Sequence, residues 1–167
     1  MQRSCQDGRV SGPAYSSTHV GWREWVGMPG VGLPWVKAKI DTGARTSSLH
    51  AEDVEEFERD GRPWVRFTVH PWQGSSADPT LVECPVHDRR KVRSSSGHVQ
   101  RRLVIRVDLR LGGRTVPAEV TLSKRDRMGF RMLVGREALR QGYVVDPDRS
   151  YAGGKPPKDV RRRNRGR

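Results

Sequence analysis

The sequence predicts an all-β fold of barrel type with one short helix near its C-terminal end. Short runs of alternating apolar and polar residues recur along the chain, as in strands that bury one face. Turn signals built from Gly, Pro and Asp-Gly separate these runs at short intervals. Helical patterns are scarce, so we expect a barrel closed by strands.

The first half of the chain is expected to form strands separated by turns. Trp22 and Trp25 should lie in the core, whereas Lys37 and Lys39 should face solvent. Residues 53–59 have the pattern of a short helical turn, and the Asp-Gly pair that follows signals a tight turn. The strand patterns in this half cover residues 19–26, 36–40, 46–51, 64–69 and 80–86.

The second half is expected to contain one long hairpin and the helix. Residues 103–111 and 115–122 alternate and flank a Gly-Gly pair, which predicts a hairpin. Leu133 and Val134 form a short apolar run typical of a buried strand. Residues 137–141 predict one or two helical turns, which Gly142 ends as a C-cap.

Composition suggests one domain with polar ends. The chain has 167 residues, 34% of them hydrophobic, which suits one modest core. We expect a disordered leader over 1–18, a domain over 19–152 and a disordered basic tail over 153–167. Apolar runs long enough for a membrane span or a signal peptide are missing, and the two cysteines suggest no disulfide, so we expect a cytoplasmic protein.

The most informative motif is Asp41-Thr42-Gly43, which follows an alternating apolar run. A strand that ends in such a turn can present a carboxylate at the floor of a cleft. Two carboxylates a few ångströms apart cannot both ionise, so they share a proton and can activate water. The chain has one such tripeptide, so a pair of aspartates would require a homodimer.

Several further segments, together with this motif, resemble those of a known protein family. Residues 21–24 read GWRE, 38–51 read AKIDTGARTSSLHA, 92–97 read VRSSSG, 102–105 read RLVI and 132–136 read MLVGR. From about residue 20 to 152, the chain resembles a bacterial, RimK-associated family of retropepsin-like aspartic peptidases labelled "ATP-dependent zinc protease". The resemblance implies a single retropepsin-like lobe and an aspartic-type peptidase that acts as a homodimer.

The resemblance also assigns roles to individual residues. Asp41 would be the catalytic carboxylate, Thr42 would hold the two turns together across the dimer, and Gly43 would let backbone amides approach. Retroviral enzymes pair the late Gly-Arg arginine with an acid directly after D-T-G-A, but that position is Arg45 here. The residues expected to support the site are Ala44, Leu133, Val134, Gly135 and Arg136.

Residues 94–97 occupy the place of a retropepsin flap, which closes over substrate and excludes water. Basic residues line its arms, so a cleft beneath it should prefer acidic peptides. The family's association with ATP-grasp enzymes that add glutamates implies trimming of glutamate tails and a glutamate ligase as functional partner. The expected substrate-binding residues are Arg45, Arg93, Ser95, Ser96, Gly97 and Arg101.

Two alternatives remain open. Cys84, His87 and His98 could ligate zinc, although neighbouring cations oppose it, and we expect no cofactor. No phosphate-binding loop is present, so any ATP dependence would belong to a partner. The net charge of +13, of which the seven cations and one acid of residues 155–167 supply +6, would also suit a non-catalytic module that binds RNA or the ribosome.

Overall fold

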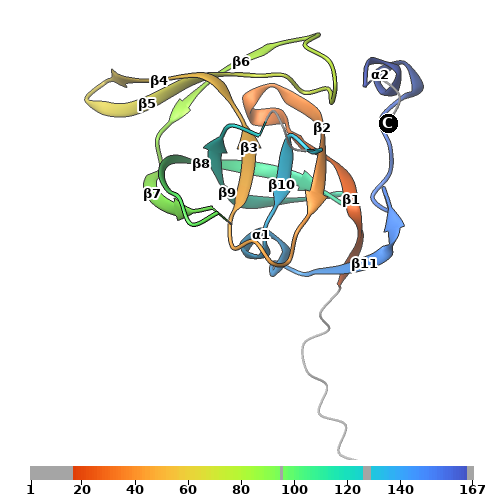
Figure 1. Cartoon of the computed structure of the whole chain (residues 1–167). Helices are drawn as coiled ribbons and strands as arrows, with labels where there is room; N and C mark the ends of the chain where they lie inside the picture. Colours follow the sequence, from red (N-terminus) through yellow and green to blue (C-terminus); the bar gives the residue numbers. More distant parts are fainter. Residues whose placement is uncertain (1–16, 95, 126–128, 165–167) are drawn as a thin grey trace, which may run out of the picture.

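The computed structural model describes residues 17–94, 96–125 and 129–164, and these form eleven strands and two α-helices (Figure 1). The helices are α1 (Arg136–Leu139) and α2 (Lys158–Arg163), and a 3-10 turn, η1, spans Pro29–Val31. The predicted all-β class is therefore confirmed. The strands are β1 (Thr18–Met28), β2 (Leu33–Ile40), β3 (Ser47–His50), β4 (Glu52–Arg59), β5 (Arg62–Val69), β6 (Thr80–Pro85), β7 (Asp88–Arg93), β8 (Val99–Leu111), β9 (Arg114–Ser123), β10 (Met132–Val134) and β11 (Tyr143–Ser150).

The larger of the two sheets curls into a ring. Its strand order is β11-β1-β2-β10-β3-β9-β8-β7, and a further pairing of Gly27 in β1 with Arg110 in β8 joins the two ends of the central part. This closure leaves no free edge among the strands from β1 to β8 in the sheet order, whereas β11 and β7 remain at the edges of the sheet. Strands β4, β5 and β6 form a separate three-stranded sheet beside the ring (Figure 1).

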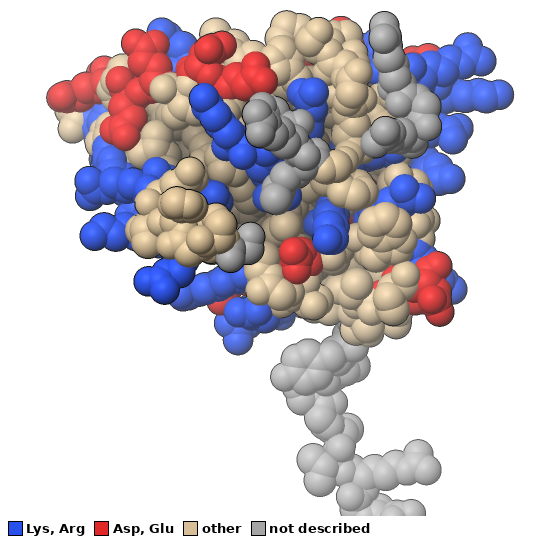
Figure 2. Space-filling view, in the orientation of Figure 1, with Lys and Arg blue, Asp and Glu red and all other residues tan. Residues whose placement is uncertain are grey.

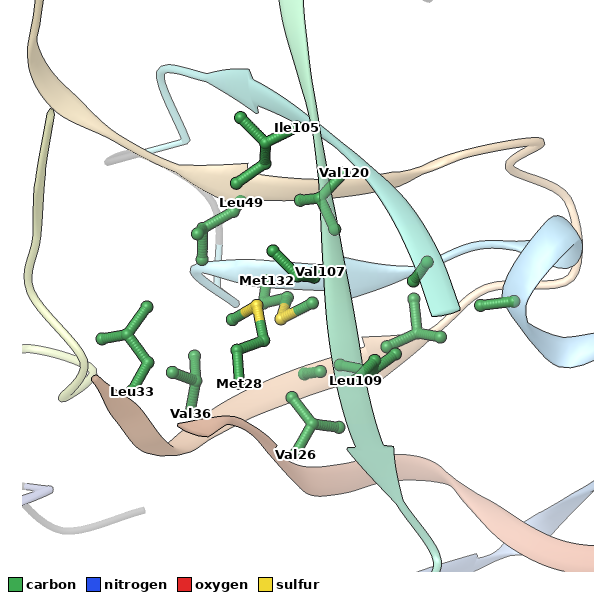
Figure 3. Packing of buried hydrophobic residues seen from close by; sticks show 14 of the residues in the cluster. Val26, Met28, Leu33, Val36, Leu49, Ile105, Val107, Leu109, Val120 and Met132 are labelled. Atoms are coloured by element: carbon green, nitrogen blue, oxygen red, sulfur yellow. The ribbon is translucent and has the colours of Figure 1, made fainter. Parts of the chain in front are cut away.

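The hydrophobic core fills the inside of the ring (Figure 3). Met28, Leu33, Leu109 and Met132 are each fully buried, and they come from four different strands. Full burial of a side chain of this size is worth roughly 1.5–3 kcal/mol. In β8, burial alternates from Ile105 to Leu111, in agreement with the alternating pattern of this segment.

The hairpins were predicted with one error. The long hairpin is confirmed as β8–β9, and Gly112 and Gly113 occupy its turn with φ of 60° and 77°, values that favour glycine. Residues 53–59, however, belong to strand β4 and not to a helical turn. They pair antiparallel with β5 through the predicted Asp60-Gly61 turn, and this pairing overrides their local helical preference.

Two expectations about the first strands are wrong. Trp25 is buried as expected, but Trp22 is 36% exposed because the pairing of β1 with β11 shifts register around it. Lys37 is 2% exposed and does not face solvent. Its Nζ lies 5.3 Å from the ring centre of Trp25 and 5.5 Å from that of Tyr151, so aromatic rings cover it.

The basic tail differs from the disordered segment expected over 153–167, because residues 158–163 form α2. The Asn164 side chain accepts a hydrogen bond of 2.7 Å from the Gln73 backbone N–H, and Arg163 lies 3.4 Å from Asp78. The buried Asn164 thus attaches the tail, which has few apolar residues, to the loop that contains Gln73.

Residues 1–16 of the expected leader lie outside the described residues. Within the described part of the chain, no helix combines the length and apolar character needed to cross a membrane.

Candidate active site

The Asp41 turn lies where three neighbouring strands of the sheet, β2, β10 and β3, come together. Strand β10 lies between β2 and β3 in the sheet, parallel to β2 and antiparallel to β3. The chain from 41 to 46 must therefore pass the end of β10 to reach β3. The backbone N–H of Asp41 donates to the carbonyl of Val134 at 2.9 Å, which ties the turn to β10.

The turn itself holds the Asp41 carboxylate. Oδ1 accepts hydrogen bonds from the backbone N–H groups of Gly43, at 2.9 Å, and Ala44, at 3.3 Å. A Cβ at position 43 would lie 3.2 Å from Oδ1, which is tight. Thr42 and Gly43 are both exposed, so the tip of the turn is accessible to a second chain.

The segment after β10 braces the turn through backbone contacts. The N–H of Arg136 donates to the carbonyl of Ala44 at 2.7 Å, and the N–H of Gly135 donates to Ser47 Oγ at 3.0 Å. A Cβ at Gly135 would lie 2.5 Å from the carbonyl carbon of Thr46, so only glycine fits here. The structure therefore brings together the two motifs that the sequence analysis paired.

Arg136 has a backbone partner. Its Nη1 donates to the carbonyl of Thr42 at 2.9 Å. Arg45, which stands where retroviral enzymes carry an acid, lies 3.8 Å from Glu137 and its side chain is 79% exposed. Arg136 thus holds the turn by binding a backbone carbonyl. Asp41 is the only acidic residue of the turn itself.

A cavity of about 530 Å³ opens in front of Asp41. One side of the cavity is apolar, because Trp22 packs edge-to-face on Phe130 with ring centres 6.0 Å apart, and Leu133 lies beside them. Lys39 and Arg125 line the same cavity, so the carboxylate is accompanied by two cations and two aromatic rings.

Arg125 is the cation that the sequence analysis missed. Burial lowers the pKa of its guanidinium, the charge of Arg102 lowers it further, and the charge of Asp41 acts in the opposite direction. Its backbone N–H donates to Nδ1 of His50 at 2.7 Å. No motif includes Arg125, and only the folding of the loop before β10 brings it to Asp41.

His50 anchors this loop and is nearly fully buried. Since Nδ1 accepts from Arg125, the ring hydrogen is on Nε2, which donates to Glu52 at 3.0 Å. His70 approaches the other oxygen of Glu52 at 3.1 Å. The hydrogen bond from His50 is the largest influence that lowers the pKa of Glu52.

The segment expected to form the flap is the β7–β8 hairpin, whose described residues do not line the Asp41 cavity, so its role as a flap stays a prediction. Ser95 lies outside the described residues. Ser96 and Gly97 are exposed at the tip, and Arg93 and Arg101 are exposed on the arms. Their assignment to substrate binding stays a prediction.

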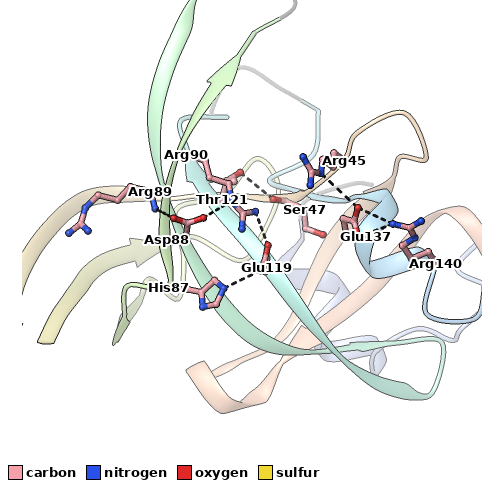
Figure 4. A network of polar contacts seen from close by, with 10 residues as sticks. All are labelled: Arg45, Ser47, His87, Asp88, Arg89, Arg90, Glu119, Thr121, Glu137 and Arg140. Atoms are coloured by element: carbon pink, nitrogen blue, oxygen red, sulfur yellow. Dashed lines mark hydrogen bonds and ion pairs between the residues drawn. The ribbon is translucent and has the colours of Figure 1, made fainter.

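Part of the positive charge of the flap arms is already neutralised. Arg89 lies 2.7 Å from Glu56. Arg90 lies 2.7 Å from Glu119 and 2.8 Å from Asp88 (Figure 4). These pairs make Arg89 and Arg90 poor candidates for binding substrate.

Arg45 belongs to a different cavity. This cavity, of about 570 Å³, lies between α1 and β9 and is lined by Arg45, Arg90, Arg106 and Arg140 together with two glutamates. Glu137 contacts Arg140 at 3.2 Å as well as Arg45 (Figure 4). The structure thus does not bring Arg45 to the Asp41 cavity, and its predicted contact with substrate stays untested.

The alternative zinc ligands do not come together. Cys84 is buried in β6, and burial raises the pKa of its thiol to about 11, which disfavours the thiolate that binds zinc. His87 contacts Glu119 at 3.0 Å, and His98 is exposed near the flap tip. The described residues contain no group of three or more His, Cys, Asp or Glu that could hold a metal ion.

Curated relatives share sequence with most of this chain. A protein named "Probable alpha-L-glutamate ligase" from Shewanella halifaxensis is 46% identical over 132 residues, which are 79% of this chain and 29% of the relative. A protein of the same name from Parasynechococcus marenigrum is 48% identical over 132 residues, or 28% of its length. The chain thus spans less than a third of the curated relatives that it matches.

Structure and family comparisons cover the same region. The crystal structure of Lpg0085, a protein of unknown function from Legionella pneumophila, has a TM-score of 0.69 and 28% identity over 81% of this chain and 98% of its own. Residues 19–156 match the RimB-like family, described as "Retropepsin-like aspartic endopeptidase RimB". Since this match covers most of the sequence, the chain belongs to the RimB-like family of retropepsin-like aspartic endopeptidases.

Proposed function

We propose that this chain is an aspartic-type peptidase that hydrolyses peptide bonds in acidic protein segments. The observation that carries the proposal is the Asp41 carboxylate, which two backbone amides hold at an open cavity of about 530 Å³. The family name supports a peptidase of this type.

The chemistry requires two chains. Two Asp41 carboxylates would share one proton and position a water molecule between them. One carboxylate takes a proton from the water as it attacks the peptide carbonyl, and the other donates its proton to the carbonyl oxygen. Because Thr42 and Gly43 are exposed at the turn, two turns can approach each other in a homodimer.

The substrate class follows from charge and from the relatives. The chain carries a net charge of +13, and an acidic segment would be attracted to it at low salt. Relatives that contain a region like this one are named as glutamate ligases. Because of this name, we propose that the peptidase trims glutamate-rich segments in the cytoplasm and works with a glutamate ligase.

The test replaces the carboxylate by its amide. Asp41→Asn is nearly isosteric, and we expect loss of hydrolysis of a glutamate-rich peptide with unchanged circular dichroism. Asp108→Asn is a matched control, because Asp108 is exposed on β8 and does not line the Asp41 cavity. Full activity of Asp41→Asn would refute the proposal, and loss of wild-type activity in a chelator would favour a zinc enzyme.

Mixing the two proteins tests the shared dyad. If chains exchange freely, an equal mixture of wild type and Asp41→Asn contains about one quarter wild-type dimers. Activity per total chain should therefore fall to about a quarter of the pure wild type, against about half for independent monomers. A value near one half would contradict the intermolecular dyad.

A second candidate, a non-catalytic module that binds RNA or the ribosome, rests on the same positive charge and on Arg161, Arg162 and Arg163 in α2. It predicts no hydrolysis by the wild type and salt-dependent binding of RNA that Asp41→Asn leaves unchanged.

A further inference from the structure

Arg125 and Arg102 are two partly buried arginines whose guanidinium groups have little hydrogen bonding. Nε of Arg102 is buried and has no hydrogen-bond partner among the described residues. Among the described residues, Nε of Arg125 reaches only the carbonyl of Phe130, at 3.4 Å. A buried polar group without a good partner is costly, and more so when it is charged.

The two arginines also repel each other. The charge of Arg102 acts on Arg125, and the nearby Asp41 offsets this only in part. Two like charges in a partly desolvated place destabilise the fold, unless an anion joins them. Their arrangement is therefore unfavourable in the free protein and favourable once a carboxylate binds.

The two arginines line two separate cavities. Arg125 lines the Asp41 cavity, and Arg102 lines a second cavity of about 810 Å³, together with Arg101 and Lys124. Lys124 and Arg125 are consecutive residues, so one loop contributes a cation to each cavity.

The acids of this second cavity lie on β4. Asp53 and Glu56 line it opposite the cations, and Glu56 is already paired with Arg89 at 2.7 Å. Figure 2 shows the same separation on the surface, with most acidic side chains gathered over the β4–β5 hairpin and Lys and Arg spread over the rest of this face. The cations of β8 and of the loop after β9 therefore remain available to a ligand.

The apolar side of the Asp41 cavity favours a glutamate over a shorter acid. Trp22 and Phe130 stand beside Arg125 and Lys39 in one cavity. The methylene groups of a glutamate can pack on the rings while its carboxylate reaches the guanidinium, and arginine binds carboxylates through paired hydrogen bonds.

We infer that Arg125 and Arg102 form a carboxylate-binding track that leads from Asp41 and selects glutamate-rich peptides. This inference rests on the proposed function and locates its specificity in Arg125 and in the partly buried Arg102 of the β8 flap arm, rather than in the exposed Arg93 and Arg101. Arg125 binds the side chain next to the scissile bond, and Arg102 binds a carboxylate further along the chain.

The experiment measures binding separately from hydrolysis. Every variant is made in the Asp41→Asn background, and the probe is a labelled penta-glutamate peptide followed by fluorescence anisotropy, with penta-glutamine as the neutral control. We expect Arg125→Gln and Arg102→Gln each to weaken penta-glutamate binding at least tenfold. Arg62→Gln removes the same charge from an exposed position on β5 and should change binding less than twofold.

The melting temperature of the variants distinguishes arginines that bind a ligand from arginines that stabilise the fold. Because the two charges repel and Arg102 Nε has no described partner, Arg102→Gln should leave the melting temperature unchanged or raise it. A structural arginine would lower it on removal. If Arg125→Gln folds poorly, Arg125→Lys keeps the charge without the paired geometry and should weaken binding by a smaller factor.

Several results would overturn the inference. These are binding of both glutamine variants within twofold of their parent, a lowered melting temperature of Arg102→Gln, and equal binding of penta-glutamine. Displacement of the peptide by a single-stranded oligonucleotide with the same dependence on Arg125 would assign the track to nucleic acid and also overturn it. The proposed function fails separately, if the protein with Asp41 intact binds penta-glutamate through these arginines but never cleaves it.

Discussion

Replacing Glu24 by Gln should destabilise the protein, although the two side chains have nearly the same shape. Glu24 is fully buried, and its carboxylate accepts three backbone hydrogen bonds. Oε1 accepts from Gly21 at 2.7 Å and from Ala152 at 2.8 Å, and Oε2 accepts from Gly153 at 3.2 Å. The side chain thus fastens the irregular start of β1 to the segment after β11.

The size of the effect follows from these bonds. Gln can keep both bonds at its carbonyl oxygen, but its NH₂ group would face the N–H of Gly153. One hydrogen bond to a charged group, worth roughly 1.5–3 kcal/mol, is lost, and the other two become weaker neutral bonds. The lower desolvation cost of Gln offsets part of this, so we expect a loss of about 2–4 kcal/mol in the free energy of unfolding.

Urea denaturation at matched protein concentration measures this value, because self-association would otherwise shift the midpoint. Glu55→Gln is the control, since Glu55 is 67% exposed and lies 3.7 Å from Arg66, and it should cost less than about 1 kcal/mol. Hydrogen exchange of the Ala152 and Gly153 amides should accelerate in Glu24→Gln. A loss below about 0.5 kcal/mol would show that the three bonds do not stabilise the fold.

Three further predictions concern other parts of the molecule. Gly135→Ala should destabilise the protein by at least about 3 kcal/mol in urea denaturation, because its Cβ would lie 2.5 Å from the backbone of Thr46, and wild-type stability would contradict this close packing. In a Cys5→Ser background, Cys84 should react with iodoacetamide at pH 8 far more slowly in the folded protein than in urea, since burial raises its thiol pKa to about 11; equal rates would contradict its burial. The pKa of Glu52 is lowered in the folded state, so its contribution to stability is present above its unfolded pKa of about 4.3 and is lost as the pH falls through the folded pKa. Glu52→Gln should therefore lose less stability than the wild type below about pH 4, and parallel pH profiles would contradict this.

The parts of the site that depend on local sequence could be predicted. The Asp41 turn uses hydrogen bonds between residues two or three positions apart, so the motif alone indicates its geometry. The pairing of this turn with Gly135 came from a resemblance, and its physical reason is visible only in the structure. Strand β10 is inserted between β2 and β3, and no local pattern predicts this order.

The cavity residues outside the two motifs could not be predicted, because long-range contacts place them. Trp22 looked like a core residue by its alternation, but the irregular pairing of β1 with β11 turns it outward against Phe130. Arg125 reaches the cavity through a loop to which His50 makes two hydrogen bonds, one from the Arg125 N–H to Nδ1 and one from the His50 N–H to the Arg131 carbonyl. Residues 53–59 were mistaken for a helical turn for the same reason, since their partner strand lies beyond the Asp60-Gly61 turn.

Arg45 stands where retroviral enzymes carry an acid, and this difference affects both how the turn is held and how much negative charge lies near Asp41. With no acid beside the turn, Arg136 binds the carbonyl of Thr42, a contact that adds no negative charge near Asp41. Glu137, the nearest acid on α1, contacts Arg45 and Arg140 at the cavity between α1 and β9. Asp41 is therefore the only acid among the described residues that line its cavity, and Lys39 and Arg125 line the same cavity. The turn is held by backbone hydrogen bonds and by the contact of Arg136 with Thr42, neither of which adds a second acid near Asp41. Under the proposed function, an acidic substrate side chain would be attracted to the two cations of this cavity.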